Sequence, residues 1–159
     1  MATAGQIIRA SDITRVVAFA TLTANSSTTT TELVTITVGS ASYQTGRAYR
    51  ATLKALVNSS VANDTVTCRV RRGTTTAGQA VLNTFSTKCV TTAENWPVFF
   101  QGYFSASSNF TDAFCATIDR RTGTGNILMA ASATEHVAYL LIEDLGANSL
   151  NSYPGIIAV

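Results

Sequence analysis

Threonine and serine carry most of the polarity of this chain, and this feature constrains the fold more than any other. Charged residues make up only 13% of the sequence, about half of the roughly 25% found in an ordinary soluble domain. Threonine runs occupy 28–31, 74–76 and 91–92. A β-branched side chain with a hydroxyl suits the solvent face of a pleated strand and suits a helix poorly. The composition therefore predicts an all-β body with neutral, hydroxyl-covered faces.

Hydrophobic alternation supports this reading along most of the chain. In 49–57, apolar side chains at every second position oppose Arg50, Thr52 and Lys54. Roughly eight to ten such segments are separated by turn residues, and strands at this spacing indicate a sandwich or barrel. We predict an antiparallel β-sandwich. One short stretch, 76–82, is the single helix candidate.

The sequence divides into a body and two different ends. With 159 residues, a single domain can bury roughly 70% of its unfolded surface. We assign 16–146 to the β-sandwich body, 1–15 to an N-terminal docking arm without clean alternation, and 147–159 to a C-terminal tail. The tail ends in an apolar tip. Because an exposed apolar tip favours aggregation, we expect it to pack on a neighbouring subunit or another protein.

The charge and hydropathy of the sequence exclude some classes of partner. The formal net charge is +2, which is too small to indicate nucleic-acid binding. The sequence has no apolar run of about 18 residues, so we expect no membrane span. The first residues lack the basic start and apolar stretch of a signal peptide.

The cysteine content leaves three interpretations open. Cys68, Cys89 and Cys115 form an odd set without a CxxC pair, and each lies in an expected strand. They could supply one disulfide with a free thiol, or a nucleophile. We favour three small buried apolar side chains.

Residues that could carry catalysis are few and poorly arranged. His136 is the only histidine, so it could act as a base or metal ligand, but a zinc site would then need unusual partners. Glu143 and Asp144 are adjacent, and adjacent strand residues point to opposite faces, so they cannot easily flank one bond. Gly123-Thr124-Gly125 lacks the lysine and helix of a phosphate loop. We expect no enzymatic activity, no cofactor and no metal.

Two arginine pairs stand at similar places in the sequence. Arg71-Arg72 and Arg120-Arg121 each end an alternating strand just before a Gly/Thr turn. If both turns lie at the same end of the sandwich, the four side chains form a basic rim that could dock an acidic protein surface. Alternatively, the arginines mark solvated strand ends.

Several short motifs resemble a known group of proteins. The opening Gly5-Gln6-Ile7-Ile8-Arg9-Ala10-Ser11-Asp12 resembles the start of small virion proteins from tailed phages of actinobacteria, and the likeness continues at 46–50, 68–74 and 143–146. The body is also similar in style to trimeric jelly rolls of the tumour-necrosis-factor and C1q type. The resemblance implies a jelly-roll homotrimer at the virion surface, made in the host cytoplasm.

The resemblance leaves head and tail locations open. We expect a capsid decoration protein that binds the outside of the major capsid protein lattice, because no stalk precedes the body. The alternative is a tail-fibre or minor tail knob that contacts tail proteins and binds cell-surface carbohydrate. A small carbohydrate-active enzyme is disfavoured by its missing carboxylate and histidine geometry.

The docking arm is the expected anchor on the virion. Its mixture of aliphatic and charged residues cannot close a core by itself, but it can lie along a partner as an added strand or extended arm. The expected docking residues are Ile7, Ile8, Arg9, Asp12, Ile13 and Arg15.

Overall fold

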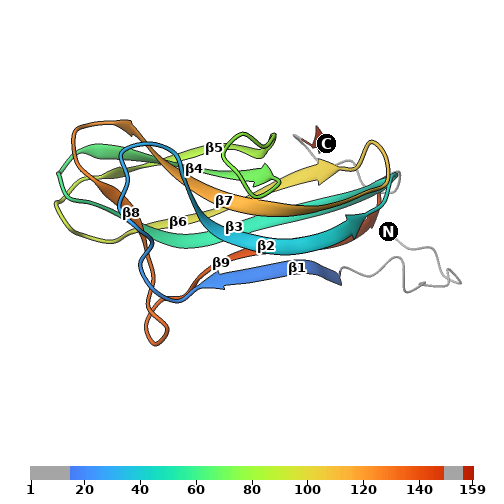
Figure 1. Ribbon diagram of the computed structural model, residues 1–159, viewed down its shortest axis with the longest axis horizontal. Helices are drawn as coiled ribbons and strands as arrows, with labels where there is room; N and C mark the ends of the chain where they lie inside the picture. Colours follow the sequence, from blue (N-terminus) through green and yellow to red (C-terminus); the bar gives the residue numbers. More distant parts are fainter. Residues whose placement is uncertain (1–14, 149–155) are drawn as a thin grey trace, which may run out of the picture.

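The computed structural model describes residues 15–148 and 156–159, and this part of the chain is all-β (Figure 1). Ten strands form two sheets that pack face to face as a sandwich. The helix candidate at 76–82 does not form a helix. Residues up to Gln79 form a loop, closed where Arg72 N–H donates to the Gln79 carbonyl at 2.8 Å, and a strand begins at Ala80.

The larger sheet has the order β1-β9-β3-β6-β10, with β8 also paired to β3. Its strands are β1 (Arg15–Leu22), β3 (Arg47–Ser59), β6 (Trp96–Ser105), β8 (Ile127–Ala130), β9 (Ala138–Ala147) and β10 (Ile157–Ala158). All of these pairings are antiparallel except that of β10, which runs parallel to β6.

The smaller sheet has the order β2-β7-β4-β5 and is antiparallel throughout. Its strands are β2 (Leu33–Tyr43), β4 (Asp64–Arg72), β5 (Ala80–Cys89) and β7 (Phe110–Thr122). β1 and β2 lie beside each other at one margin of the sandwich, and β5 and β6 lie beside each other at the opposite margin.

The core lies between the sheets because alternate side chains of each strand point inward. One end of it is filled by aromatic rings. Tyr43 stacks on Phe110 at 4.9 Å between ring centroids, and its edge meets Phe114 at 5.1 Å. Tyr49 stacks on Phe104 at 5.2 Å. Such pairs each add about 0.5–1.5 kcal/mol beyond the area they bury, so this end of the sandwich is firmly fixed.

The apolar tip of the tail packs on the chain's own body. Ile157 and Ala158 pair with Phe104 and Ser105 of β6. Val159 is buried, and its carbonyl accepts hydrogen bonds from the Ser107 N–H and hydroxyl, both at 2.9 Å. The tip therefore has a partner within its own chain, and its expected contact with another subunit or another protein stays a prediction. The docking-arm boundary also shifts, since Arg15 already belongs to β1.

All three cysteines are buried and unpaired. Burial raises the pKa of Cys68 to about 12 and also raises the pKa of Cys89 and Cys115. The expectation of small buried side chains is confirmed, and the disulfide alternative is wrong for this fold.

We expect these thiols to resist a thiol reagent in the folded protein at pH 8. A buried thiol with a raised pKa supplies little thiolate, and the thiolate is the reactive species. Mass spectrometry should find three additions after unfolding in denaturant and none in the native state. Rapid native labelling of any one cysteine would contradict its buried position.

Candidate interaction surfaces

The two arginine pairs lie at opposite ends of the sandwich. β4 and β7 are antiparallel neighbours, so Arg71 and Arg72 stand opposite Cys115 and Phe114, whereas Arg120 stands opposite Val66. The four arginines could form a shared basic rim only if β4 and β7 ran parallel or were not neighbours in the sheet. The four arginines therefore do not form one docking surface.

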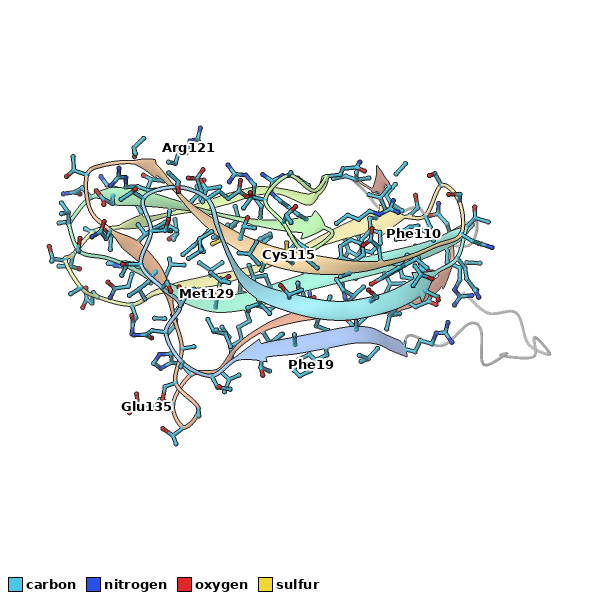
Figure 2. The ribbon with its side chains drawn as sticks, in the orientation of Figure 1. Phe19, Phe110, Cys115, Arg121, Met129 and Glu135 are labelled. Carbon is cyan, nitrogen blue, oxygen red and sulfur yellow. The ribbon has the colours of Figure 1, made fainter. Side chains whose placement is uncertain are left out.

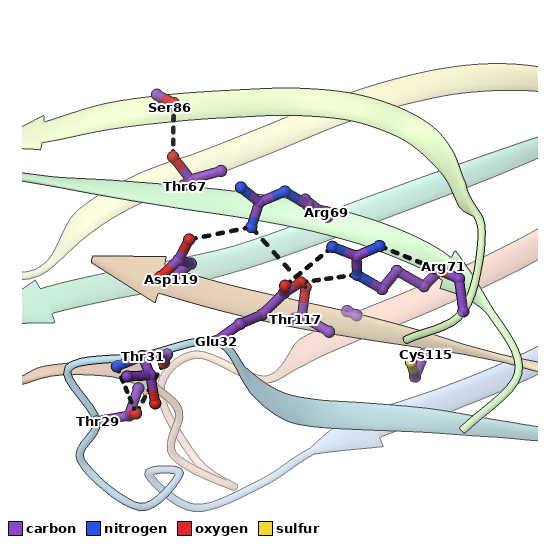
Figure 3. Close-up of polar contacts among 12 residues, drawn as sticks. Thr29, Thr31, Glu32, Thr67, Arg69, Arg71, Ser86, Cys115, Thr117 and Asp119 are labelled. Carbon is purple, nitrogen blue, oxygen red and sulfur yellow. Dashed lines mark hydrogen bonds and ion pairs between the residues drawn. The ribbon is translucent and has the colours of Figure 1, made fainter. Parts of the chain in front are cut away.

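Arg71 belongs to a polar network on the outer face of the smaller sheet (Figure 3). Its Nε and Nη2 donate to the two carboxylate oxygens of Glu32 at 2.7 and 2.9 Å, and the Thr117 hydroxyl donates to the same carboxylate at 2.6 Å. Arg69 lies 3.5 Å from Glu32 and 3.3 Å from Asp119. The positive charges here are thus matched within the chain.

The other three arginines of the expected rim differ in their surroundings. The Nε of Arg72 donates to Asp112 at 2.9 Å, and its guanidinium lies 3.8 Å from the centre of the Phe110 ring. Arg120 donates to the Gly125 carbonyl at 2.6 Å. Arg121 is exposed at the end of β7 (Figure 2). A partner that needs free cations would find only Arg121 among these four residues.

Gly123-Thr124-Gly125 binds an anion, but the anion is a side chain of the same protein. The N–H groups of Thr124 and Gly125 donate to the buried carboxylate of Asp64 at 3.1 and 2.8 Å, and the Ser59 hydroxyl donates at 2.7 Å. Burial raises the pKa of Asp64. The hydrogen bonds and the Arg120 charge outweigh that effect and hold its pKa below the usual value. The turn is structural.

We expect stability to fall as the pH falls below about 4, the usual range of a carboxyl pKa. Burial raises the pKa of Glu32, but the hydrogen bonds to its carboxylate and the Arg71 and Arg69 charges lower that pKa by more. The net pKa of Glu32 is therefore below its usual value, as is that of Asp64. A carboxyl whose folded-state pKa is depressed stabilises the fold above its unfolded-state pKa and loses that effect as pH falls through the folded-state pKa.

Urea unfolding at pH 7 and pH 3 measures this contribution. Glu32→Gln should be less stable by about 1 kcal/mol at pH 7 and should show a smaller loss at pH 3. Glu135→Gln is the matched control, because the Glu135 side chain is 78% exposed. An unchanged pH dependence in Glu32→Gln would contradict the role of this network.

Of the six expected docking residues, only Arg15 lies within the described part; Ile7, Ile8, Arg9, Asp12 and Ile13 lie outside it. The Nε of Arg15 is 3.3 Å from the buried Asp144 carboxylate. The same carboxylate accepts from Arg47 Nε at 2.7 and 2.9 Å and from the Gly146 N–H at 2.9 Å. This contact thus holds Arg15, the first residue of β1, against Asp144 of β9.

The outer face of the larger sheet is a surface that the sequence analysis did not single out. Strand register arranges it in three rows that each cross β1, β9, β3 and β6 in that order. The rows are Val16–Glu143–Arg50–Tyr103, Phe19–Leu141–Thr52–Gln101 and Thr21–Tyr139–Lys54–Phe99. We call these twelve residues the outer face. Alternation along each strand indicates which side chains point outward, so these twelve residues could have been identified from the sequence once the strand order was known.

A register shift in β1 places Phe19 on the outer face. Between Val16 and Ala18 the pairing with β9 slips by one residue. As a result, both Val17 and Ala18 pack toward the core, while Phe19 is 55% exposed (Figure 2). Simple alternation puts Val17 and Phe19 on one face, so this bulge could not be read from the sequence.

A shallow groove of about 370 Å³ lies where β2 ends and β7 begins. It is lined by Ser42, Tyr43, Gln44, Asn109, Phe110 and Thr111. The Tyr43 ring stacks on the Phe110 ring, and the Arg72 guanidinium also lies over it, so the faces of the Phe110 ring are already in contact with other side chains. The groove therefore offers hydroxyl and amide groups rather than an open ring for sugar stacking.

The described residues contain no group of three His, Cys, Asp or Glu side chains that could hold a metal. His136 lies 3.9 Å from Glu135 near the β8–β9 loop. Glu143 and Asp144 point to opposite faces, as expected, since Glu143 pairs with Arg50 outside and Asp144 is buried. Among the described residues there is also no helix long and apolar enough to cross a membrane.

Comparison with solved structures finds chains from infectious bursal disease virus among the similar structures. The VP2 protein of infectious bursal disease virus aligns with a TM-score of 0.46 and 12% identity, over 86% of this chain and 41% of that chain. A structure of the Gx strain of that virus gives a TM-score of 0.40 and 15% identity, over 94% and 47%. A CBM4 structure gives 0.26 and 16%, over 79% and 78%.

This chain spans less than half the length of those viral chains. No protein-family model matches the sequence, and comparison with curated proteins finds no match. Function therefore has to be argued from this chain's own strand order and side chains.

Proposed function

We propose that this chain is a structural protein of a bacteriophage virion, with a jelly-roll body that decorates the outside of the capsid. The observation that carries the proposal is the strand order, β1-β9-β3-β6 facing β2-β7-β4-β5. From β1 to β4 the chain alternates between the two sheets. Two sets of four strands connected in this way are typical of the jelly roll, which recurs in viral coat and lectin domains, and β8 and β10 are additions to the larger sheet. The sequence resemblance at 5–12 favours the viral use.

The proposed mechanism is binding without catalysis. A protein that binds the assembled shell and not its free subunits stabilises the shell by mass action. The N-terminal arm would bind the major capsid protein, and three copies would form a homotrimer at the virion surface. No enzymatic activity, cofactor, nucleic acid or membrane enters this role.

A tail-fibre or minor tail knob that binds host carbohydrate is the second candidate. The groove between β2 and β7 favours it, because Gln44 and Asn109 bring two amide groups together there. The Ser42 and Thr111 hydroxyls of the groove already bond each other at 3.0 Å, so the amides are the candidate contacts for a sugar. Polar groups of this kind can orient a sugar in a shallow site.

Copy number per particle separates the two candidates. Gel densitometry of purified particles should give a copy number comparable with that of the major capsid protein if the chain decorates the head. A handful of copies per particle would overturn decoration and support the tail role. Light scattering of the free protein should give three times the mass of 16.7 kDa if the trimer forms before binding.

Removal of residues 1–14 tests the arm as anchor. The shortened protein keeps Arg15 and the whole of β1, so we expect unchanged β-type circular dichroism. It should no longer be captured by undecorated capsids, whereas the full chain should be. Full occupancy by the shortened protein would place the anchor elsewhere.

A further inference from the structure

We propose that the outer face of the larger sheet is a second docking surface, which seats against the same virion partner that the arm binds. The partner surface would be flat and largely neutral, with a carboxylate opposite Lys54. This inference rests on the proposed function, since it takes the shell protein as the partner.

The first argument is the exposure of large apolar side chains. Five of them are exposed in the described part of the chain, and three of the five lie on this one face: Val16 at 62%, Phe19 at 55% and Phe99 at 57%. Phe19 and Phe99 stand on the two outer strands of the four, β1 and β6. A concentration of exposed apolar side chains on one sheet face marks an interaction site.

The second argument is that several polar groups of the face are already bonded to one another. Arg50 lies 2.7 Å from Glu143, and Gln101 Nε2 donates to the Thr52 hydroxyl at 3.1 Å. These groups can be covered by a partner without losing their hydrogen bonds, so the cost of removing water from them is low. A saccharide site would instead need polar groups free to bond the ligand. The face therefore suits contact with protein.

The third argument concerns Lys54, which lies in an end row of the face, between Tyr139 and Phe99. It is exposed and forms no salt bridge within the described residues. Its Nζ is 5.9 Å from the centre of the Tyr139 ring. Because charged groups across an interface are arranged to complement one another, the partner should place a carboxylate opposite this amine.

The fourth argument is where the arm joins the body. Residues 1–14 precede β1, which is an outer strand of this same sheet. Fourteen residues span at most roughly 50 Å, so the arm can reach the same partner that the face contacts. Two linked contacts raise the effective concentration of each for its own site. The arm would capture the partner, and the face would fix the orientation of the body on it.

The test is binding of full-length variants to undecorated capsids, measured by co-sedimentation over a concentration series. Phe19→Ser, Phe99→Ser and Lys54→Glu should each weaken binding by about thirtyfold, the size of an interface hot spot. Val61→Ser and Val90→Ser are matched controls, because these side chains are 39% and 52% exposed outside this face. Lys88→Glu is the control for the charge change. Controls should bind like the unmodified protein.

Circular dichroism and thermal unfolding establish that each variant is folded, and light scattering gives its mass. Equal binding by the face variants and the controls would overturn this inference while leaving the proposed function standing. A lower oligomeric mass in the face variants would also overturn it, because the face would then join copies of this chain. Failure of the unmodified protein to bind capsids would overturn the proposed function itself, and with it the partner assigned here.

Discussion

Replacing Gly123 with alanine is expected to lower the free energy of unfolding by at least about 3 kcal/mol. Gly123 has a φ of +107°, a region that L-residues with a side chain rarely adopt. A Cβ at this position would stand 1.7 Å from Oδ1 of Asp64. The clash would displace the Asp64 carboxylate from its hydrogen bonds with the N–H groups of Thr124 and Gly125. A buried charge without hydrogen-bond partners is costly.

Gly46→Ala is the matched control for backbone strain. Gly46 also has a positive φ, +75°, but a Cβ there meets nothing within 4 Å. This control should cost only about 1–2 kcal/mol. Urea unfolding of both variants at pH 7 measures the difference. Equal losses in the two variants would show that the contact with Asp64 contributes nothing beyond the strain.

The second large effect is expected for Asp144→Ala, which should lose about 3 kcal/mol of stability. The Asp144 side chain is fully buried, and the side chain of its partner Arg47 is only 14% exposed. Removing the carboxylate takes from Arg47 the negative group that its Nε contacts at 2.7 Å and leaves the Gly146 N–H without its acceptor. The Arg15 contact that ties β1 to β9 is lost as well.

Glu143→Ala is the neighbouring control. Glu143 pairs with Arg50 on the outer face, where the two side chains are 14% and 30% exposed. Both of these side chains keep some contact with water, whereas that of Asp144 has none, so this variant should lose less stability than Asp144→Ala, about 1–2 kcal/mol. Urea unfolding of both variants gives the comparison. Similar losses for Glu143→Ala and Asp144→Ala would contradict the different burial of these adjacent residues.

Local alternation predicted much of the fold because it depends only on neighbouring residues. The opposite orientation of Glu143 and Asp144 follows from the two-residue period of a strand, and burial of Cys68 follows from its place between Val66 and Val70. Cys115 is buried for a different reason, because its Sγ lies outside the core cluster, 3.8 Å from the Thr75 carbonyl of the loop that follows β4. The all-β class followed from threonine content. None of these expectations required knowledge of which strands are neighbours.

The interaction surfaces could not be predicted because they depend on strand order. Arg71 and Arg120 follow the same local pattern, but the antiparallel pairing of β4 with β7 sends them to opposite ends. The three rows of the outer face join β1 to β6 through strands far apart in sequence. The Asp64 carboxylate meets Gly125 across 61 positions. No local signal in the sequence specifies such distant contacts.

The pairing of β1 with β9 has a consequence for synthesis of the protein. β1 is made early, yet its hydrogen-bonding partner in the sheet emerges more than a hundred residues later, on the order of ten seconds at ribosomal rates. Throughout that interval the growing chain holds strands whose backbone groups have no sheet partner, a state that favours aggregation. β1 carries a single hydroxyl side chain, that of Thr21, so it depends on β9 both to satisfy its backbone groups and to complete its sheet.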